Sequence, residues 1–373
     1  MYLWQVDEWP RMRLDEARLA RQLADVRHRQ GLLQGRMGAL GFPLRQEAVL
    51  RTLTLDIVKS SEVEGELLDT EQVRSSLARR LGLDAGAVPA TDRNVEGIVE
   101  VMVDATGGFD RPLTRERLWA WHGALFPAGR SGLRRVRVGA WRDDEQGPMQ
   151  VVSGPVGRQR VHFEAPPAAR LDAEMDAFLA WFEGEPAEDP VLKAALAHLW
   201  FVTVHPFEDG NGRIARAIAD MALARSEGSG QRFYSMSSRI QQVRRAYYRE
   251  LERAQSGGID VSAWGEWFLA CLGEAVDGAR LTLDSVLAKA RFWERHRGVS
   301  MNDRQARVLN RVLDGFEGRL TTSKWAAVAG CSQDTAWRDI LALVERGVLR
   351  RGAGGGRSTA YEVQIPGGPD DAG

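Results

Sequence analysis

Apolar residues recur at helical spacing through most of this chain, and this periodicity limits its fold more than any other feature. Residues 43–61 show it clearly, with Val49, Leu53 and Ile57 four residues apart. The same pattern predicts helices over 13–36, 69–81, 93–105, 114–125, 171–182, 190–204, 212–226, 238–254 and 262–277. Convincing strands are few. The sequence therefore predicts a mainly α fold.

Two stretches depart from this pattern. Gly and Pro recur between residues 132 and 167, where Met149–Val152 and 159–163 flank Ser153-Gly154-Pro155. Two short runs around such a turn predict a β-hairpin. Residues 82–91, GLDAGAVPAT, read as a loop.

The last part of the chain has its own pattern. A connecting helix at about 279–297 is followed by predicted helices at 303–316, 322–329 and 332–346. Strands at 348–351 and 359–365 flank the Gly-rich turn AGGGRS. Three helices followed by a β-hairpin are typical of a winged helix-turn-helix domain. We therefore expect four parts: an N-terminal helical domain (1–90), a core (91–277), a linker helix (278–299) and a winged helix (300–366).

Composition and net charge bear on the compartment and the partners of the protein. The net charge is −1, so no global field attracts nucleic acid or membrane. Cys271 and Cys331 lie far apart, which fits a reducing compartment and excludes a disulfide framework. The first residues, MYLWQVDEWPRMRLDE, lack the apolar core of a signal peptide, and no window has the apolar length of a membrane span. We expect a cytoplasmic protein with no membrane partner.

The segment from His205 to Arg216, HPFEDGNGRIAR, concentrates chemical groups. It follows an apolar helix, and Pro206 disfavours continuation of that helix past His205. Gly210-Asn211-Gly212 gives a turn directly before the next helix. Because backbone N–H groups at a helix N-terminus attract anions, this turn predicts an anion site.

The side chains around this turn suggest a polyphosphate ligand. Arg213 and Arg216 stand three residues apart on one helical face, where both can bind phosphate. Asp209, together with phosphate oxygens, is a typical Mg²⁺ ligand. His205 titrates near neutrality and is a candidate general base.

These twelve residues resemble the signature of the Fic family, His-Pro-Phe-x-Asp/Glu-Gly-Asn-Gly-Arg-x-x-Arg, at every defining position. The preceding hairpin, the segment RFYSMSSRIQQVRRAYYRELERAQ, the N-terminal helices and the tail resemble the same architecture, so the resemblance covers nearly the whole chain. It implies a Fic helical core with a β-hairpin flap. It also implies transfer of AMP from ATP to a hydroxyl side chain of a target protein, or of the chain itself.

The resemblance also implies roles for single residues. His205 would take the proton of the target's Ser, Thr or Tyr hydroxyl, and Asp209 would hold Mg²⁺. Asn211, with the amides around Gly210 and Gly212, would line the anion hole, and Arg213 and Arg216 would bind the outer phosphates. Phe207 is expected to be a buried anchor of the loop. The flap residues Met149, Gln150, Val151 and Val152 would hold the target by strand addition, and Tyr247 and Tyr248 are candidates for contact with the nucleotide base.

The stretch KSSEVEGE places Glu62, Glu64 and Glu66 at a predicted helix C-terminus, where the helix dipole favours cations. It resembles a second Fic motif, Ser/Thr-x-x-x-Glu-Gly/Asn, which marks an autoinhibitory helix. Ser60, Glu64 and Gly65 stand at its defining positions, within residues 60–65. The resemblance implies that Glu64 binds Arg216 and keeps it from the γ-phosphate of ATP. We expect Glu62 and Glu66 to be surface charges.

Two other functions stay open. A Fic fold can also remove AMP, with Glu64 positioning a water molecule. The tail could bind DNA, since residues 300–363 carry 10 Lys and Arg against 7 Asp and Glu, with Arg350, Arg351 and Arg357 in the expected wing. The acidic residues Asp334, Asp339 and Glu345 in the expected recognition helix oppose this. Dimerisation, as in a homodimer, or docking of the protein target is therefore the favoured role of the tail.

Overall fold

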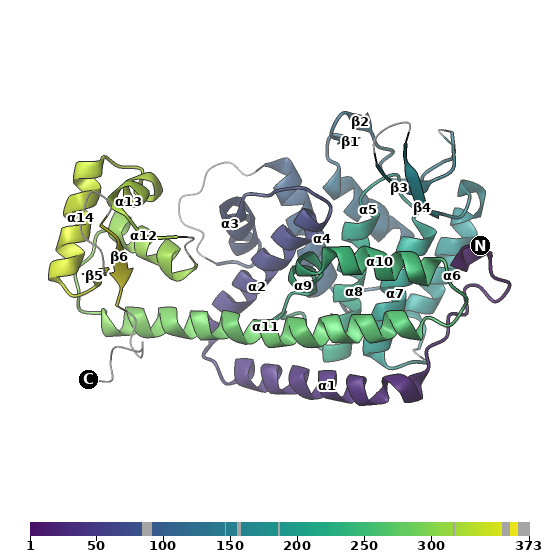
Figure 1. Ribbon diagram of the computed structural model, residues 1–373, viewed down its shortest axis with the longest axis horizontal. Coiled ribbons are helices and arrows are strands. Elements are labelled where there is room, and N and C mark those ends of the chain that lie inside the picture. The colour runs from purple at the N-terminus through teal and green to yellow at the C-terminus, as the bar shows by residue number, and fades with distance from the viewer. Residues whose placement is uncertain are drawn as a thin grey trace. The chain divides into compact units, whose positions relative to one another are not determined.

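The computed structural model describes residues 1–83, 92–145, 147–154, 158–185, 187–315, 318–352 and 359–364 (Figure 1). It is mainly helical, which confirms the predicted fold class. The chain forms two compact units, one of Met1–Leu40 with Val49–Ala279 and one of Gly41–Ala48 with Arg280–Gly373. Most of the predicted loop at 82–91, and with it the predicted boundary at residue 90, lies outside the described residues.

The first unit consists of helices and two short hairpins. Its elements are η1 (Leu3–Gln5), α1 (Glu16–Gly38), α3 (Thr70–Arg80), α4 (Arg93–Gly107), α5 (Arg115–Leu125), β1 (Arg130–Ser131), β2 (Arg134–Arg135), β3 (Gln150–Ser153), β4 (Arg160–Glu164), η2 (Ala168–Arg170), α6 (Leu171–Glu183), α7 (Pro190–Val204), α8 (Asn211–Glu227), α9 (Met236–Gln242) and α10 (Arg244–Gln255). Two further helices, α2 (Phe42–Val63) and α11 (Ser262–Arg295), have residues in both units.

Helix α7 is the centre of the first unit. Every residue from Val191 to Val204 is buried, as expected for a helix that is apolar on all sides. Asp189 caps its first turn and Pro190 occupies the first helical position, so the sequence marks its start. It lies along α8, its main packing partner, and these two helices carry the ends of the predicted active loop (Figure 1).

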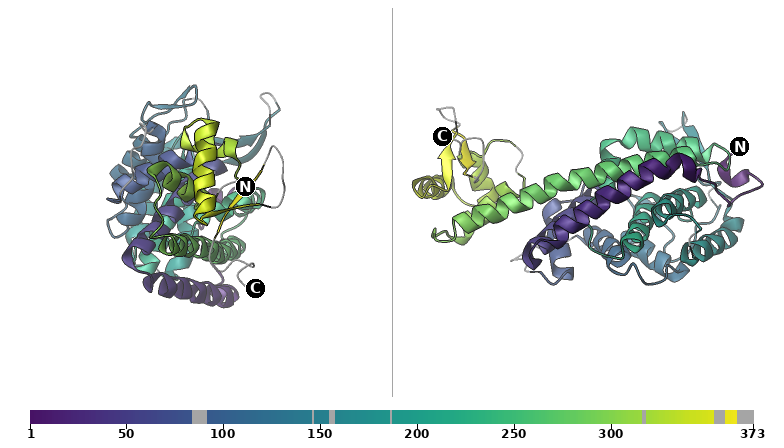
Figure 2. Two further views of the ribbon diagram at one scale, coloured as in Figure 1. Left: turned by 90° about the vertical axis from the view of Figure 1, so that its left-hand side faces the viewer. Right: turned by 90° about the horizontal axis from the view of Figure 1, so that it is seen from below.

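Helix α1 covers one side of the unit along the first part of α11. Its buried residues Leu19, Val26 and Leu33 recur every seven positions and form one stripe. The polar contacts between the helices are at their edges, where Arg18 pairs with Glu266 at 2.6 Å and Arg29 with Asp277 at 2.6 Å. The view from below in Figure 2 shows α1 and α11 running side by side.

Three predicted elements differ from the structure. The helix expected at 238–254 is two helices, because Val243 has a non-helical backbone (φ −111°, ψ 28°). The helices expected at 262–277 and 279–297 are one helix, α11, since a single Gly278 costs a helix only about 1 kcal/mol. The short hairpin β1–β2 was not predicted.

The second unit contains α12 (Asp303–Leu313), α13 (Thr322–Ala329), α14 (Gln333–Glu345) and the antiparallel strands β5 (Leu349–Arg351) and β6 (Tyr361–Val363). They pack around the buried side chains of Trp325, Ile340 and Leu343. The helices and strands expected for the tail are therefore present. The turn AGGGRS lies outside the described residues, and the winged-helix assignment stays a prediction.

Among the helices that the structure describes, none combines the length and the apolarity that a membrane span requires.

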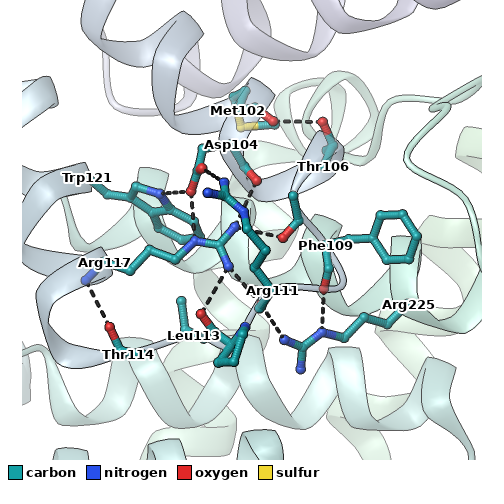
Figure 3. A network of polar contacts seen from close by, with 12 residues as sticks. Met102, Asp104, Thr106, Phe109, Arg111, Leu113, Thr114, Arg117, Trp121 and Arg225 are labelled. Carbon is teal, nitrogen blue, oxygen red and sulfur yellow. Dashed lines mark hydrogen bonds and ion pairs between the residues drawn. The ribbon is translucent and has the colours of Figure 1, made fainter.

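A polar network joins α4, α5 and α8 around the connection from residue 108 to 113 (Figure 3). Asp104 accepts hydrogen bonds from Arg117 Nε at 2.7 Å and from Trp121 Nε1 at 2.8 Å, and it pairs with Arg111. Arg225 of α8 donates to the carbonyls of Phe109 at 2.7 Å and Arg111 at 3.0 Å. These bonds satisfy loop carbonyls that no helix pairs and so fix α8 against α4 and α5.

We predict that Asp104→Asn lowers the free energy of unfolding by about 2 kcal/mol at pH 7, because Arg117 loses its charged partner. Burial raises the pKa of Asp104, but the hydrogen bonds from Arg117 and Trp121 and the charges of Arg117 and Arg111 outweigh it and lower the pKa overall. This stabilisation is therefore complete above about pH 4 and is lost as the pH falls through the lowered pKa.

Urea unfolding at pH 7 and at pH 3 measures both effects, and the difference between wild type and Asp104→Asn should shrink at the lower pH. The exposed Asp284 provides the control, since Asp284→Asn should change stability by less than about 0.5 kcal/mol. Equal stability of the two variants at pH 7 would show that the Asp104 network does not support the fold.

Candidate active site

His205 ends helix α7 in a left-handed conformation (φ 51°, ψ 58°), the one positive φ found at a non-glycine residue within the described ranges. Such strain costs on the order of 1 kcal/mol and is common at functional sites. Arg142 holds the bend, donating from Nε to the His205 carbonyl at 2.8 Å and from its backbone N–H to the Pro206 carbonyl at 2.9 Å. His205 lines one cavity together with Asn211 and Gly212 at the start of α8.

The His205 ring has one nitrogen engaged and one available. Its Nδ1 lies 3.2 Å from the Val202 carbonyl, which can only accept, so Nδ1 carries the proton and Nε2 the lone pair. Burial lowers the pKa of His205 to about 4, and the nearby positive charge of Arg142 acts in the same direction. The imidazole is therefore neutral at physiological pH and can accept a proton at Nε2.

Phe207 and Asn211 hold the loop between the two helices. Phe207 is fully buried and stacks on His122 with ring centroids 4.1 Å apart, which confirms its expected anchoring role. The Asn211 side chain accepts from the Phe207 N–H at 3.0 Å and donates to the Phe207 carbonyl at 2.7 Å. The Asn211 side chain therefore closes the loop. Only the backbone of Asn211 is left for the role in the anion hole that was expected of this residue.

The loop ends at the N-terminus of α8, where an anion is favoured. Gly210 has φ 79°, and a Cβ there would lie 2.9 Å from the Phe126 ring, so only glycine fits. Asp209 accepts from the Gly210 N–H at 2.6 Å and from the Ser131 hydroxyl. Both donors are neutral, and together with phosphate oxygens the carboxylate fits the oxygen ligand set of Mg²⁺.

The C-terminus of helix α2 faces this site. Gly65 has φ 88°, and the Glu66 N–H reaches the Ser61 carbonyl at 3.0 Å, which is the Schellman arrangement of a helix end. The tight turn at Gly65 directs the carboxylates of Glu64 and Glu66 toward α8. Glu62 pairs with Lys59 of its own helix at 2.8 Å, and its side chain is only 19% exposed, less than expected for a surface charge.

Glu64 pairs with Arg216, as the resemblance implied, with 2.8 Å between Oε1 and Nη2. Arg216 is 2% exposed and also donates to the Ser60 hydroxyl and to the Ser60 carbonyl, each at 2.9 Å. A Cβ placed on Gly212 would lie 2.2 Å from Glu64 Oε1, so this carboxylate is seated against the first turn of α8. An internal carboxylate thus occupies the predicted anion position.

Glu66 is exposed, as predicted for a surface charge, but it also pairs with the other motif arginine, which was not predicted. Glu66 Oε2 lies 2.6 Å from Arg213 Nη1, and Arg213 is 5% exposed. The two residues line a cavity of about 470 Å³ together with Ser131 and Phe126. Both arginines of the motif are therefore held by carboxylates of the 60–66 segment.

A larger cavity of about 1080 Å³ lies between the loop and the flap. It is lined by His205, Asp209, Gly210, Asn211 and Gly212, by Glu64, and by the predicted flap residues Met149, Gln150, Val151 and Val152. Strands β3 and β4 form the predicted antiparallel hairpin, apart from Pro155, which lies outside the described residues. The cavity has the volume of a small-molecule site.

The two tyrosines expected near the nucleotide base differ from each other in exposure. Tyr247 is 1% exposed and its hydroxyl lies 2.9 Å from His198 Nε2, so it packs largely in the core, although it also lines the cavity between the loop and the flap. Tyr248 is 38% exposed, and its hydroxyl lies 3.2 Å from the Val63 carbonyl and 3.4 Å from Glu64 Oε2. Tyr248 therefore supports the end of α2 in this state.

Comparison with known proteins gives matches in two parts of the chain. Residues 112–223 match the Fic/DOC family, and residues 2–83 match a domain of unknown function, DUF4172. A protein adenylyltransferase Fic from Nematostella vectensis is 38% identical over 97 residues, which are 25% of this chain and 21% of that protein. Protein adenylyltransferase fic-1 from Caenorhabditis elegans is 53% identical over 38 residues, 10% of this chain and 8% of that protein. The chain thus matches about a fifth or less of the length of these relatives.

Solved structures are similar over much more of the chain. A Fic family protein from Desulfovibrio desulfuricans G20 has a TM-score of 0.52 at 23% identity, covering 93% of this chain and 95% of that one. A Fic domain containing signaling protein from Bacteroides thetaiotaomicron has a TM-score of 0.51 at 18% identity, covering 70% of this chain and 97% of that one. At these identities the likeness concerns the fold. This chain therefore shares the fold of Fic proteins, and its residues 112–223, which include the whole His205–Arg216 segment, match the Fic/DOC family.

Proposed function

We propose that this chain is a protein adenylyltransferase that transfers AMP from ATP to a hydroxyl of a target protein, and that it is held inactive by its own α2 segment. One observation carries the proposal: a neutral imidazole and the amide-rich start of α8 line one cavity, and internal carboxylates occupy both arginines beside it. The relatives named protein adenylyltransferase support the same reaction class.

In the proposed reaction His205 acts as the general base. Nε2 accepts the proton of the target hydroxyl, whose oxygen attacks the α-phosphorus, and pyrophosphate leaves. The hydrogen bond from Nδ1 to Val202 fixes the tautomer that makes Nε2 the acceptor. A bound polyphosphate brings negative charge near the ring and raises its pKa, which strengthens the base.

The start of α8 binds the phosphates in this proposal. The free N–H groups of its first turn attract the phosphate oxygens, and the guanidinium groups of Arg213 and Arg216 hold the outer phosphates once the carboxylates leave. Asp209 would hold Mg²⁺, which neutralises charge on the leaving pyrophosphate.

The flap presents the target. Strand β3 pairs only with β4 in the part of the chain that the structure describes, so its outer edge offers backbone groups to a segment of the target. Main-chain pairing of this kind positions a hydroxyl without reading much of the neighbouring sequence, and we therefore propose a target defined mainly by an accessible Ser, Thr or Tyr.

Inhibition follows from competition for the arginines. While Glu64 holds Arg216, that guanidinium is not free for the γ-phosphate, and ATP is misaligned for in-line attack. A misplacement of about 1 Å can cost on the order of 10²-fold in rate. Glu66 acts on Arg213 in the same way, as a second inhibitory contact.

We predict that Glu64→Gly raises self-labelling by ATP carrying ³²P in the α-phosphate, on the order of 10²-fold, because Arg216 becomes available to the γ-phosphate. Glu62→Gln is the matched control, since Glu62 lies on the same turn but contacts Lys59. Equal labelling of Glu64→Gly and Glu62→Gln would contradict the inhibitory role.

Glu66→Gln should also activate, by roughly fivefold, because a half-exposed ion pair contributes about 1 kcal/mol. Added to Glu64→Gly, it should raise the labelling rate further at ATP concentrations below saturation. The measurement is the initial rate of labelling against ATP concentration. A Glu66→Gln protein with wild-type rates at every ATP concentration would remove Glu66 from the mechanism.

In the Glu64→Gly background, His205→Ala should abolish labelling of other proteins in a cell lysate, because no group takes the target's proton. ATP binding measured by calorimetry should change little, since the phosphates are held by α8 and the arginines. Continued labelling of lysate proteins by the purified double variant would exclude His205 as the base.

Removal of AMP is the second candidate reaction. It is favoured by the position of the Glu64 carboxylate against the start of α8, where it could orient a water molecule toward an AMP-modified residue. The two reactions can be told apart with AMP-modified protein as the substrate. Only AMP removal converts it to unmodified protein and free AMP.

For the tail we propose a protein partner, either a second copy of the chain or the target. In the described part of the expected wing, Arg350 pairs with Glu362 at 3.0 Å, which weakens its attraction for phosphate. In the expected recognition helix Asp339 pairs with Arg304 at 2.6 Å, so Asp334 and Glu345 are the acids left there to oppose contact with phosphates. DNA binding stays the alternative, and a salt-dependent shift of duplex DNA would favour it.

A further inference from the structure

A second group of chemically competent side chains lies on the flap. Ser153 Oγ is 2.6 Å from His162 Nε2, and His162 Nδ1 is 3.0 Å from Glu252 Oε2. A carboxylate only accepts, so Nδ1 carries the proton of the neutral ring and Nε2 accepts from the Ser153 hydroxyl. Hydroxyl, imidazole and carboxylate in this order are the arrangement that activates a nucleophilic serine.

The backbone of the hairpin aims His162 at these partners. Val151 pairs with Phe163 and Val152 with Val161, so His162 is the extra residue of a β-bulge in strand β4. A bulge redirects a side chain and is frequent beside active sites. Glu252, on the facing helix α10, is held in place by Arg160 of the same strand, with 2.7 Å between Arg160 Nη2 and Glu252 Oε1.

This group shares the cavity of the proposed reaction. Ser153, His162 and Glu252 line the same space of about 1080 Å³ as His205, Asp209 and Gly212. Ser153 is exposed, so its hydroxyl is open to a ligand in that space. Ser153 directly follows the flap residues that are expected to hold a target. The chain itself therefore supplies a hydroxyl on the strand where a target hydroxyl would be presented.

We propose that Ser153 is a self-modification site that accepts AMP, with His162 as its own base; this rests on the proposed adenylyltransfer. Ser153 Oγ attacks the α-phosphorus of ATP, and the bond from that phosphorus to the oxygen bridging to the β-phosphate breaks. Pyrophosphate leaves with the electron pair, and the serine proton passes to His162 Nε2. Glu252 stabilises the resulting imidazolium. The product is Ser153 bearing AMP through a phosphodiester.

The test is the position of AMP on the activated chain. Full-length Glu64→Gly protein is incubated with ATP and Mg²⁺, digested, and the AMP at each hydroxyl is quantified by mass spectrometry. We expect AMP on Ser153, its loss in Ser153→Ala, and its return on residue 153 in Ser153→Thr. His162→Gln should lower the rate at Ser153 by about 10²-fold, as expected for removal of a general base. Glu252→Gln should lower it less.

A matched control separates the base from mere support of the flap. Arg160→Gln removes the other bond between β4 and Glu252 and leaves Ser153 and His162 in place. It should keep the share of AMP at Ser153, relative to other hydroxyls of the same sample, within about twofold, whereas His162→Gln should lower that share at least about tenfold.

Each contrary result has a distinct meaning. AMP on other hydroxyls but none on Ser153 overturns this inference and leaves the proposed function standing. AMP on Ser153 that falls equally in Arg160→Gln and His162→Gln overturns the role of His162 as base. Absence of AMP from every residue of Glu64→Gly protein overturns both the inference and the proposed function.

Discussion

The buried guanidinium of Arg216 is the constraint on which the site depends. A charge that is 2% exposed is costly unless an anion and hydrogen-bond acceptors surround it. The chain supplies both from one segment, with the Glu64 carboxylate at 2.8 Å and two oxygens of Ser60 at 2.9 Å. Because a phosphate could supply the same charge, the proposed function requires that the nucleotide displace the very carboxylate that stabilises this state.

The position of α2 determines whether that competition exists. Asp56 of α2 is 3% exposed and accepts from the Ser237 N–H and hydroxyl, each at 3.1 Å, at the start of α9. Two turns later α2 ends in the Schellman arrangement at Gly65. There Glu64 pairs with Arg216 and Glu66 with Arg213, both in the first turns of α8. A change that moves α2 by a few ångströms would therefore release both arginines together, and in the proposed mechanism the α2 segment is the point of control.

The pairing of Glu64 with Arg216 was expected from the resemblance to the Fic inhibitory motif. Local patterns in the sequence were sufficient for most helices and for the flap hairpin. They were not sufficient where contacts join distant residues. Glu66 and Arg213 are 147 positions apart, and Glu252 is 90 positions from His162, so no spacing rule links them. For the pair of Glu66 with Arg213, the available signal was the order Glu64, Gly65, Glu66, because a turn at glycine can direct both flanking acids to the same side. Nothing in the pattern of apolar residues marks the end of α9 at Val243.

The central claim is that the chain transfers AMP and that Glu64 prevents it. Intact-protein mass spectrometry after incubation of purified wild type and Glu64→Gly with ATP and Mg²⁺ tests both parts at once, because the added mass identifies the transferred group. The account predicts one or more AMP additions on Glu64→Gly and an unchanged mass for most wild-type molecules. Unchanged mass for both proteins, equal modification of both, or an adduct other than AMP would contradict it.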